Sequence, residues 1–314
     1  MGNFMGKKIF KIGTRASKLA LWQAHWVQSQ LNKFFPGVET KIIKITTKGD
    51  QILDRPLALV GGKGLFVKEI EKALLEKKID IAVHSMKDMP GILPSGLFIG
   101  AVPPRENPYD VIVSRKNIKL KNLPVNAEIG TSSLRRASQL KNFRSDFIIS
   151  SIRGNLETRI KKLNAGEFDA IVLAAAGIKR LGLENLVTEY LDEKIMVPAV
   201  GQGALCIETR KNDKIIGPAI SKLNHADTAT CVKGERAFLN KLEGSCHIPV
   251  GCFARFVDEN IMLTGIVASE DGTKIIKHTL YAESNTVEKK GVELADTLLN
   301  KGARQILENL KTDE

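Results

Sequence analysis

Strand-like and helix-like segments alternate through the first two-thirds of this 314-residue chain, and that alternation restricts its fold more than any other feature. Short apolar runs at residues 79–83 and 111–114 are typical of buried strands. The amphipathic segment 65–78 and the segment 18–35, which follows the capping residue Ser17, are typical of helices. Alternation of this kind predicts α/β units in which helices cover a mostly parallel sheet.

The last third of the chain has a different pattern. A predicted helix at 226–242 is followed by three strand candidates at 250–256, 261–268 and 274–281, and then by a final helix at 286–310. Strands that are grouped without helices between them predict an antiparallel α+β domain.

Two short proline-containing segments separate these parts of the chain. The first is residues 103–108, with three prolines, and the second is residues 197–201. We expect the chain to cross between α/β units at both places, which makes them candidate hinges.

The chain is strongly basic, because 47 Lys and Arg residues against 35 Asp and Glu residues give a formal charge of +12. Residues 130–162 hold eight basic and two acidic residues, which is about half of the net charge. Five of the eight basic residues are arginines, whose planar fork of donors suits carboxylates and phosphates. Aromatic residues make up only 5% of the chain, which argues against a base-stacking platform for nucleic acid.

The arginines lie where predicted strands pass into predicted helices. Residues 130–136, Gly-Thr-Ser-Ser-Leu-Arg-Arg, form one such junction, and residues 153–155, with Arg159 one turn later, form the next. Residues 13–17 form a third and weaker example. Free backbone N–H groups at a helix start attract anions, whereas the helix dipole disfavours cations there. The clustering therefore favours an anion-binding rim over a solvated basic helix face.

Residues 84–90, His-Ser-Met-Lys-Asp-Met-Pro, follow the predicted strand 79–83. Polar residues just past the carboxyl end of a strand lie where α/β folds bind their ligands. Asp88 is an acid in a basic chain, and Pro90 prevents easy continuation as helix or strand. Both a catalytic carboxylate for an anionic substrate and a turn whose aspartate caps the backbone are consistent with this segment.

The four cysteines lack paired spacing and are expected to be reduced thiols. Cys206 and Cys252 lie in apolar strand-like runs, which is typical of buried thiols. Cys246 lies in a loop with glycine and polar neighbours, which favours exposure. His247 beside it does not make a metal site, because adjacent residues of an extended chain point in opposite directions and no CxxC or HxxxH motif accompanies them.

Two glycine-rich segments fail as nucleotide-binding motifs. Residues 61–64 are followed by Leu65 where a phosphate loop requires Ser or Thr, and residues 201–203 lack the third glycine of a dinucleotide fingerprint. The first segment is better interpreted as a flexible lid that carries Lys63.

Taken in order, these motifs resemble the porphobilinogen deaminase family, also called hydroxymethylbilane synthases. The matching segments are 13–15, 61–66, 82–88, 130–136, 153–155, 173–183, 198–204 and the Cys246 loop. The resemblance implies a transferase of tetrapyrrole (haem) biosynthesis that joins four porphobilinogen molecules head to tail, with loss of ammonia, to give hydroxymethylbilane.

The resemblance also implies an architecture. It consists of two hinged, doubly wound α/β lobes that resemble type II periplasmic binding proteins, plus a C-terminal α+β domain with a three-stranded antiparallel sheet. Residues 1–103 with 200–221 would form the lobe of the catalytic aspartate, residues 104–199 the arginine-rich lobe, and residues 222–314 the domain that anchors the cofactor.

The roles of individual residues follow from the same resemblance. Asp88 matches the catalytic aspartate, which is expected to stabilise azafulvenium intermediates, and Cys246 matches the cysteine that carries a dipyrromethane cofactor through a thioether. Further cofactor contacts match Lys87, Ser17, Thr131, Ser132, Ser133, Arg135, Arg136 and Arg153. Substrate contacts match Arg15, Ser17, Arg153, Arg159, Arg180 and Lys63.

The expected partner is the small molecule porphobilinogen, without nucleic acid, membrane or metal, and the family suggests a monomer. A cytoplasmic location is expected because the sequence shows neither a secretory signal nor a membrane-length apolar run. Two other functions remain open. A non-catalytic anion-binding protein would leave Cys246 without a task, and a nucleic-acid binder, suggested by the charge, lacks a recognisable binding module.

Overall fold

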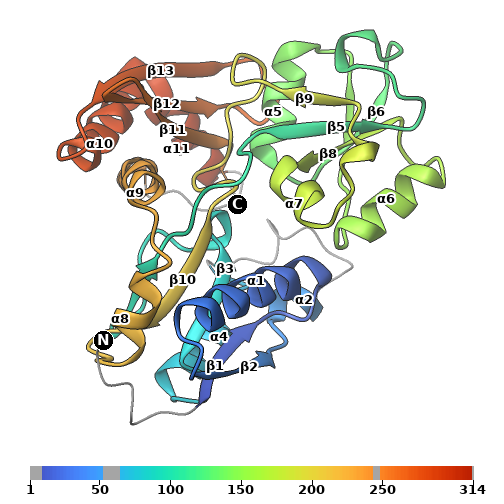
Figure 1. Ribbon diagram of the computed structural model, residues 1–314. Helices are drawn as coiled ribbons and strands as arrows, with labels where there is room; N and C mark the ends of the chain where they lie inside the picture. Colours follow the sequence, from blue (N-terminus) through green and yellow to red (C-terminus); the bar gives the residue numbers. More distant parts are fainter. Residues whose placement is uncertain (1–8, 52–63, 243–247, 313–314) are drawn as a thin grey trace. The chain divides into compact units, whose positions relative to one another are not determined.

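The computed structural model describes residues 9–51, 64–242 and 248–312, which form two compact units (Figure 1). The first unit contains residues 9–51, 64–106 and 204–229, and the second contains residues 107–203, 230–242 and 248–312. Among the helices of these described residues, none is long and apolar enough to cross a membrane.

A five-stranded sheet with strand order β2-β1-β3-β10-β4 forms the centre of the first unit. Its strands are β1 (Ile9–Thr14), β2 (Glu39–Lys44), β3 (Ile81–Ser85), β4 (Leu97–Ala101) and β10 (Leu205–Arg210). β1 pairs in parallel with β2 and β3, whereas β10 runs antiparallel between β3 and β4. The chain therefore returns to its first sheet late in the sequence.

Helices cover both faces of this sheet. They are α1 (Lys18–Phe34), α2 (Lys48–Gln51), α4 (Lys68–Leu75) and α8 (Ile216–Ser221). Because successive side chains of a strand point to opposite faces, Ile81 and Val83 of β3 pack into one core with residues of α1 and α8. Ala82 packs into the opposite core with Leu74 and its neighbours on α4. The end of β3 is thus held firmly from both sides.

The second unit contains another five-stranded sheet, with strand order β7-β6-β8-β5-β9. Its strands are β5 (Asp110–Ser114), β6 (Glu128–Gly130), β7 (Ile148–Ser150), β8 (Ala170–Ala174) and β9 (Glu189–Leu191). β6 is parallel to β7 and β8, whereas β5 is antiparallel to β8 and β9. The connecting elements are α5 (Leu134–Phe143), α6 (Leu156–Asn164), α7 (Ala175–Arg180) and the short 3₁₀ turns η2 (Leu120–Asn122) and η3 (Glu184–Leu186). Apolar cores lie on both faces of this sheet as well.

An antiparallel sheet of order β11-β12-β13 forms the C-terminal part of the second unit. Its strands are β11 (Val250–Val257), β12 (Asn260–Ala268) and β13 (Ile275–Ala282). Its helices are α9 (Ala226–Lys241), α10 (Val287–Leu298), a π-type turn η4 (Leu299–Ala303) and α11 (Arg304–Thr312). Phe238 of α9 and Leu294 of α10 are fully buried against the sheet, and a Cβ at Gly265 of β12 would lie only 2.8 Å and 3.0 Å from them.

The predicted fold class is confirmed, because two α/β sheets with helices on both faces are followed by a three-stranded antiparallel sheet. Some element boundaries differ from the prediction. The helix predicted at 65–78 spans only Lys68–Leu75, after a turn that begins at Gly64 with a φ of 78°. The predicted final helix is broken at Gly302, whose φ of 108° lies outside the helical region. The short helix α2 was not predicted. The predicted domain boundaries and hinges stay predictions.

Candidate active site

A short turn after β3 carries Asp88. The 3₁₀ turn η1 (Met86–Asp88) follows β3 directly, and Met86 donates its backbone N–H to the carbonyl of Ala204, 3.0 Å away. Met86 and Met89 are both buried, and they fix the turn in the core. The positions between them, Lys87 and Asp88, are therefore only half-buried and stay accessible.

Lys87 and Asp88 line a cavity of about 110 Å³ in the first unit. The junction between β1 and α1 contributes Arg15 and Ser17 to the same cavity, and the turn before α4 contributes Phe66. In the part of the chain that the structure describes, no residue hydrogen-bonds or pairs with the Asp88 carboxylate. The structure thus gathers three of the predicted site residues, Arg15, Ser17 and Lys87, around the available carboxylate of a fourth, Asp88.

The guanidinium of Arg15 is held by a carboxylate that the sequence analysis missed. Its Nε lies 3.0 Å and 3.2 Å from the two Oδ atoms of Asp50, and its Nη2 also bonds to Oδ1. The ring of Phe66 lies against the guanidinium, with 4.1 Å from its centroid to Cζ. Burial acts to raise the pKa of Asp50, but Arg15 and the hydrogen bonds from Thr47 outweigh it and lower that pKa. An anion that binds Arg15 must therefore share it with Asp50.

The start of α1 is anchored beside the cavity by polar contacts. Ser17 Oγ accepts a hydrogen bond from the backbone N–H of Ala20, 3.3 Å away, as the predicted cap requires. Gln23 donates from Nε2 to the hydroxyl of Ser85 at the end of β3, 2.9 Å away. Ser17 keeps its own O–H available as a donor to a ligand.

His84 also lines this cavity, and it belongs to a group of three buried titratable side chains. His84 Nε2 lies 3.1 Å from Glu208 Oε2 of the neighbouring strand β10, and both side chains are buried. Burial, together with the charge of Glu208, raises the pKa of Glu71 on α4 to about 7, although the charge of Lys68 opposes the rise. Glu71 therefore gains or loses its proton near neutral pH.

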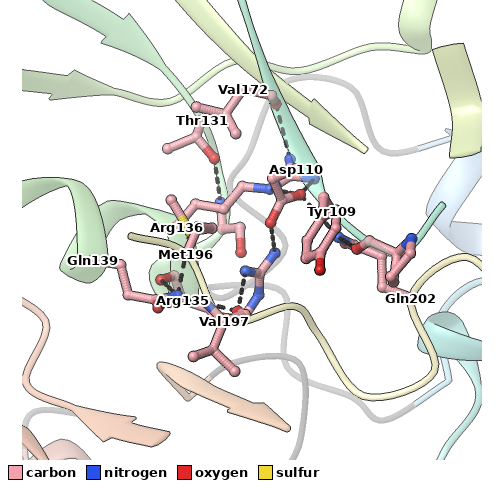
Figure 2. Close-up of polar contacts among 12 residues, drawn as sticks. Tyr109, Asp110, Thr131, Arg135, Arg136, Gln139, Val172, Met196, Val197 and Gln202 are labelled. Carbon is pink, nitrogen blue, oxygen red and sulfur yellow. Dashed lines mark hydrogen bonds and ion pairs between the residues drawn. The ribbon is translucent and has the colours of Figure 1, made fainter. Parts of the chain in front are cut away.

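Arg135 and Arg136 of the second unit share one buried carboxylate, that of Asp110. Arg135 Nη2 lies 2.8 Å from Oδ2, whereas Arg136 binds Oδ1 through Nε at 3.0 Å and Nη2 at 2.7 Å. Figure 2 shows the carboxylate between the two guanidinium groups. Arg136 also donates to the carbonyl of Val172 on β8 (2.9 Å), and Arg135 donates to that of Val197 (2.7 Å).

Arg135 also lies where three segments meet. Gln139, one turn along α5, accepts the backbone N–H of Val197 at 2.8 Å and donates to its carbonyl at 3.3 Å. A Cβ at Gly251 of β11 would lie 3.0 Å from Val197 O and 3.2 Å from Arg135 Cδ. The absence of a side chain at Gly251 thus lets β11 approach this arginine and the segment around residue 197.

The hydroxyl residues before α5 are arranged by their own hydrogen bonds. Thr131 is buried, and its hydroxyl accepts the backbone N–H of Ser133 at 3.2 Å. Ser132 is exposed and donates to the carbonyl of Ile152 at 2.7 Å, which ties the first arginine-bearing junction to the second. Among the described residues, the hydroxyl of Ser133 makes no capping hydrogen bond to α5.

Three further predicted arginines lie in this unit. Arg159 is partly buried and donates from Nε to the carbonyl of Gly154 at 3.0 Å. Burial, and then the charges of Arg136 and Arg153, lower the pKa of Arg159 to about 10. Arg180, at the end of α7, is buried and donates to the carbonyl of Gly203 at 2.7 Å. Arg159 is therefore close enough to two other positive charges to be repelled by them, which favours binding of an anion.

The predicted residues therefore fall into two groups, one in each unit. Asp88, Lys87, Arg15 and Ser17 surround one cavity. The other group lies around the starts of α5 and α6, with Arg180 at Gly203. Cys246 and Lys63 lie outside the described residues, so their roles stay predictions.

Sequence reasoning missed the acids that organise these groups. Asp110 and Glu208 each sit in a buried apolar strand, and an acid in such a run requires a partner. That signal is present in the sequence, although it does not identify the partner. The described cysteines, Cys206, Cys231 and Cys252, are buried thiols. Within the described ranges no cluster of three or more His, Cys, Asp or Glu residues could hold a metal ion.

Comparisons with known proteins cover nearly the whole chain. Residues 10–217 match a family model described as porphobilinogen deaminase, dipyromethane cofactor binding domain, and residues 229–300 match its C-terminal domain. The porphobilinogen deaminases of Syntrophotalea carbinolica and Geobacter metallireducens are each 50% identical over 303 residues, which cover 96% of this chain and 96% and 95% of those proteins. The porphobilinogen deaminase of Alkaliphilus metalliredigens is 47% identical over 306 residues, which cover 98% of this chain and 97% of that protein.

Solved structures of other proteins are more distant. An arginine-specific periplasmic binding protein of Salmonella typhimurium aligns with 71% of this chain and 94% of its own, at 14% identity and a TM-score of 0.40. The periplasmic VFT2 domain of Bordetella pertussis BvgS aligns with 69% and 86%, at 13% identity and a TM-score of 0.42.

Proposed function

This chain belongs to the porphobilinogen deaminase family, and we propose that it joins four porphobilinogen molecules head to tail, with loss of ammonia, to give hydroxymethylbilane. The observation that carries the proposal is the available carboxylate of Asp88, which shares one cavity with the cations of Arg15 and Lys87. Such a cavity suits a substrate that brings carboxylates of its own and develops a positive charge during the reaction.

Residues 10–217 form the family's dipyrromethane cofactor-binding domain, so dipyrromethane is the cofactor of this chain. The residues present fit such a group. The acetate and propionate side chains of its two pyrroles are anionic, and Arg159 lies in the repulsive field of Arg136 and Arg153. We assign Arg135, Arg136 and Arg153 to those carboxylates, with Lys87, Ser17 and the hydroxyls of residues 131–133 as further contacts. Cys246 would hold the cofactor through a thioether.

When bound, the dipyrromethane supplies a free pyrrole α-carbon that attacks the activated substrate. Asp88 has the complementary task. As ammonia leaves from the protonated aminomethyl group of porphobilinogen, an azafulvenium cation develops, and the Asp88 carboxylate stabilises it through the pyrrole N–H. We further propose that Asp88 accepts the proton that the attacking ring carbon must lose. Each addition would thus form one carbon–carbon bond, break one C–N bond and one C–H bond, and release ammonia and one proton.

Arginines hold the carboxylates of the substrate and of the growing chain. Arg15 serves the cavity of Asp88, with Lys63 as a further contact, whereas Arg153, Arg159 and Arg180 serve the second unit. Arginine suits this task because its guanidinium stays charged when it is partly buried, and because its fork binds a carboxylate through two donors.

Intact mass spectrometry of the purified chain tests the proposal directly. The chain should carry the added mass of two linked pyrroles, and the Cys246→Ser variant should lack it. A homogeneous chain of unmodified mass, which also fails to gain two pyrroles when porphobilinogen is supplied, would overturn the proposed function.

Asp88→Asn tests the role of the carboxylate. The variant should keep its fold and its cofactor mass while turnover falls by roughly 10²–10³-fold, the usual effect of losing one group that stabilises charge in a transition state. Asp227→Asn is the matched control, because Asp227 is an exposed aspartate of the same unit. Near-normal turnover by Asp88→Asn would remove Asp88 from the mechanism.

We also propose the domain assignment stated for residues 1–103 with 200–221, 104–199 and 222–314. The insertion of β10 into the first sheet supports the return of residues 200–221 to the first lobe. A monomeric, cytoplasmic protein is part of the same proposal, and sedimentation at several concentrations would test the monomer.

A further inference from the structure

Asp110 is an acid surrounded by arginines in the second unit. It is fully buried at the first position of β5, and both of its carboxylate oxygens accept hydrogen bonds from guanidinium groups. Arg135 and Arg136 are adjacent in sequence, so without a counter-ion their side chains would place two positive charges together in a buried region. They also lie in the first turn of α5, where the helix dipole disfavours cations.

We propose that Asp110 is a positioning residue for the dipyrromethane site, because its carboxylate fixes the two guanidinium groups side by side before the cofactor's carboxylates bind. This inference rests on the proposed function. Asp110 touches neither the cofactor nor the substrate in this assignment and acts only through Arg135 and Arg136.

The geometry explains how one carboxylate can orient two side chains. Arg136 is held at three points, namely Nε and Nη2 on Oδ1 and Nη1 on the Val172 carbonyl. Arg135 is held at two points, Nη2 on Oδ2 and Nη1 on the Val197 carbonyl. A guanidinium has five N–H donors, so each group keeps donors for a ligand while the orientation of its plane is set by the protein.

The charge balance supports the same role. Asp110 neutralises one of the two adjacent charges, so the pair keeps a net charge of +1 for an incoming carboxylate. Gln202 is a third partner of Asp110, because its Nε2 lies 3.1 Å from Asp110 Oδ1, and it is itself held by the Pro108 carbonyl at 2.6 Å. Gln202 thus helps to fix the orientation of the Asp110 carboxylate, and the carboxylate in turn fixes the two guanidinium groups (Figure 2).

Asp110→Asn tests the proposal, because it keeps the shape of the side chain and removes its charge. The readout is the rate at which chain prepared without cofactor gains the mass of two pyrroles after porphobilinogen is added. We expect loading to slow by about tenfold or more relative to the wild type, because two buried guanidiniums lose the anion that orients them.

The matched control is Asp80→Asn. Asp80 is also buried, and it pairs with Arg210 at 3.0 Å in the first unit. This variant loses a buried ion pair as well, so its thermal stability should fall, yet it should load at the wild-type rate. Slow loading by both variants would assign the effect to general destabilisation and overturn the positioning role.

A second pair of variants keeps the proposal testable if Asp110→Asn does not fold. Arg136→Gln leaves the Asp110–Arg135 pair intact, whereas the double variant Asp110→Asn/Arg136→Gln leaves Arg135 as the single charge of the trio. The double variant should load several-fold more slowly than Arg136→Gln alone. Equal loading rates for these two folded proteins would refute the positioning role.

The outcomes also separate this inference from the proposed function. A wild-type chain that never gains two pyrroles overturns the proposed function and this inference with it. A wild-type chain that loads normally, together with Asp110→Asn that loads at the same rate, overturns the inference alone.

Discussion

Glu71→Gln is expected to remove a pH-dependent loss of stability that the wild-type chain carries. Glu71 lies on α4, buried, and it faces the charge of Glu208 on β10, which is itself paired with His84. Within the described residues, Glu71 Oε1 and Glu208 Oε1 both lack a hydrogen-bond partner. Two carboxylates are therefore buried near a single imidazole, and the nearby charge of Lys68 only partly offsets them. Proton uptake by Glu71 relieves this imbalance.

The size of the effect follows from the pKa of Glu71, which burial and then Glu208 raise from 4.5 to about 7. Each tenfold change in proton affinity is worth about 1.4 kcal/mol, so this rise in pKa changes the free energy of unfolding by at most about 3 kcal/mol. The folded chain keeps a proton that the unfolded chain releases between pH 4.5 and about 7, so stability falls as the pH rises through this window. Glutamine has the shape of the protonated acid and does not titrate. The free energy of unfolding of the variant should therefore equal that of the wild type below pH 4.5. Above pH 7 it should exceed the wild-type value by up to about 3 kcal/mol.

Tryptophan fluorescence during urea unfolding is the appropriate assay, because both tryptophans of the chain, Trp22 and Trp26, lie on α1 of the first unit. The transition therefore reports the unit that contains Glu71. Glu76→Gln is the control. Glu76 carries an exposed carboxylate whose pKa is lowered by the hydrogen bond from Lys78. The free energy of unfolding of this variant should therefore change with pH in parallel with that of the wild type from pH 5 to 8. If the Glu71→Gln and wild-type free energies of unfolding also run parallel over that range, the reasoning is wrong.

Two further outcomes are expected. Asp50→Asn should lower the KM for porphobilinogen by up to about fivefold, because an ion pair of this partial exposure contributes about 1 kcal/mol at most and Asp50 competes for Arg15. Initial rates at several porphobilinogen concentrations measure this KM. Asp146→Asn is the control, because it breaks an ion pair of comparable exposure. An increased KM for Asp50→Asn would mean that Asp50 orients Arg15 instead. Gly154→Ala should destabilise the second unit by about 1–3 kcal/mol, since φ is 107° and the new Cβ would lie 2.7 Å from Thr158 Cβ. Thermal unfolding measures this, and an unchanged melting temperature would contradict it.

Local sequence patterns predicted the elements well where one short-range interaction decides them. Ser17 predicted the start of α1, because its hydroxyl can accept a hydrogen bond from the backbone N–H three residues later. Patterns failed where a single backbone angle decides the element. The amphipathic pattern at the C-terminus continues past Gly302, but the positive φ of that glycine breaks the helix. The turn at Gly64 shortened α4 in the same way.

The site was predicted in part for the same reason. Asp88 became a candidate because polar residues past a strand end mark a ligand site, a rule that needs only the order of residues. Its catalytic role came from the family resemblance and stays a prediction. The arginines were identified as a cluster because their junctions lie close together in sequence. Their partners were not, because a counter-ion is selected by proximity in space.

The sequence by itself determined the elements, the accumulation of arginines at helix starts and the acid after β3, because these depend on neighbours within a turn or a strand. The tertiary structure decided which charges neutralise one another. Asp110 meets arginines 25 and 26 positions away, Arg15 meets an acid 35 positions away, and His84 meets one 124 positions away. The physical reason is that strand order and packing are set by burying whole sheet faces. Buried charges then pair with whatever that packing brings within reach, and no local pattern records the result.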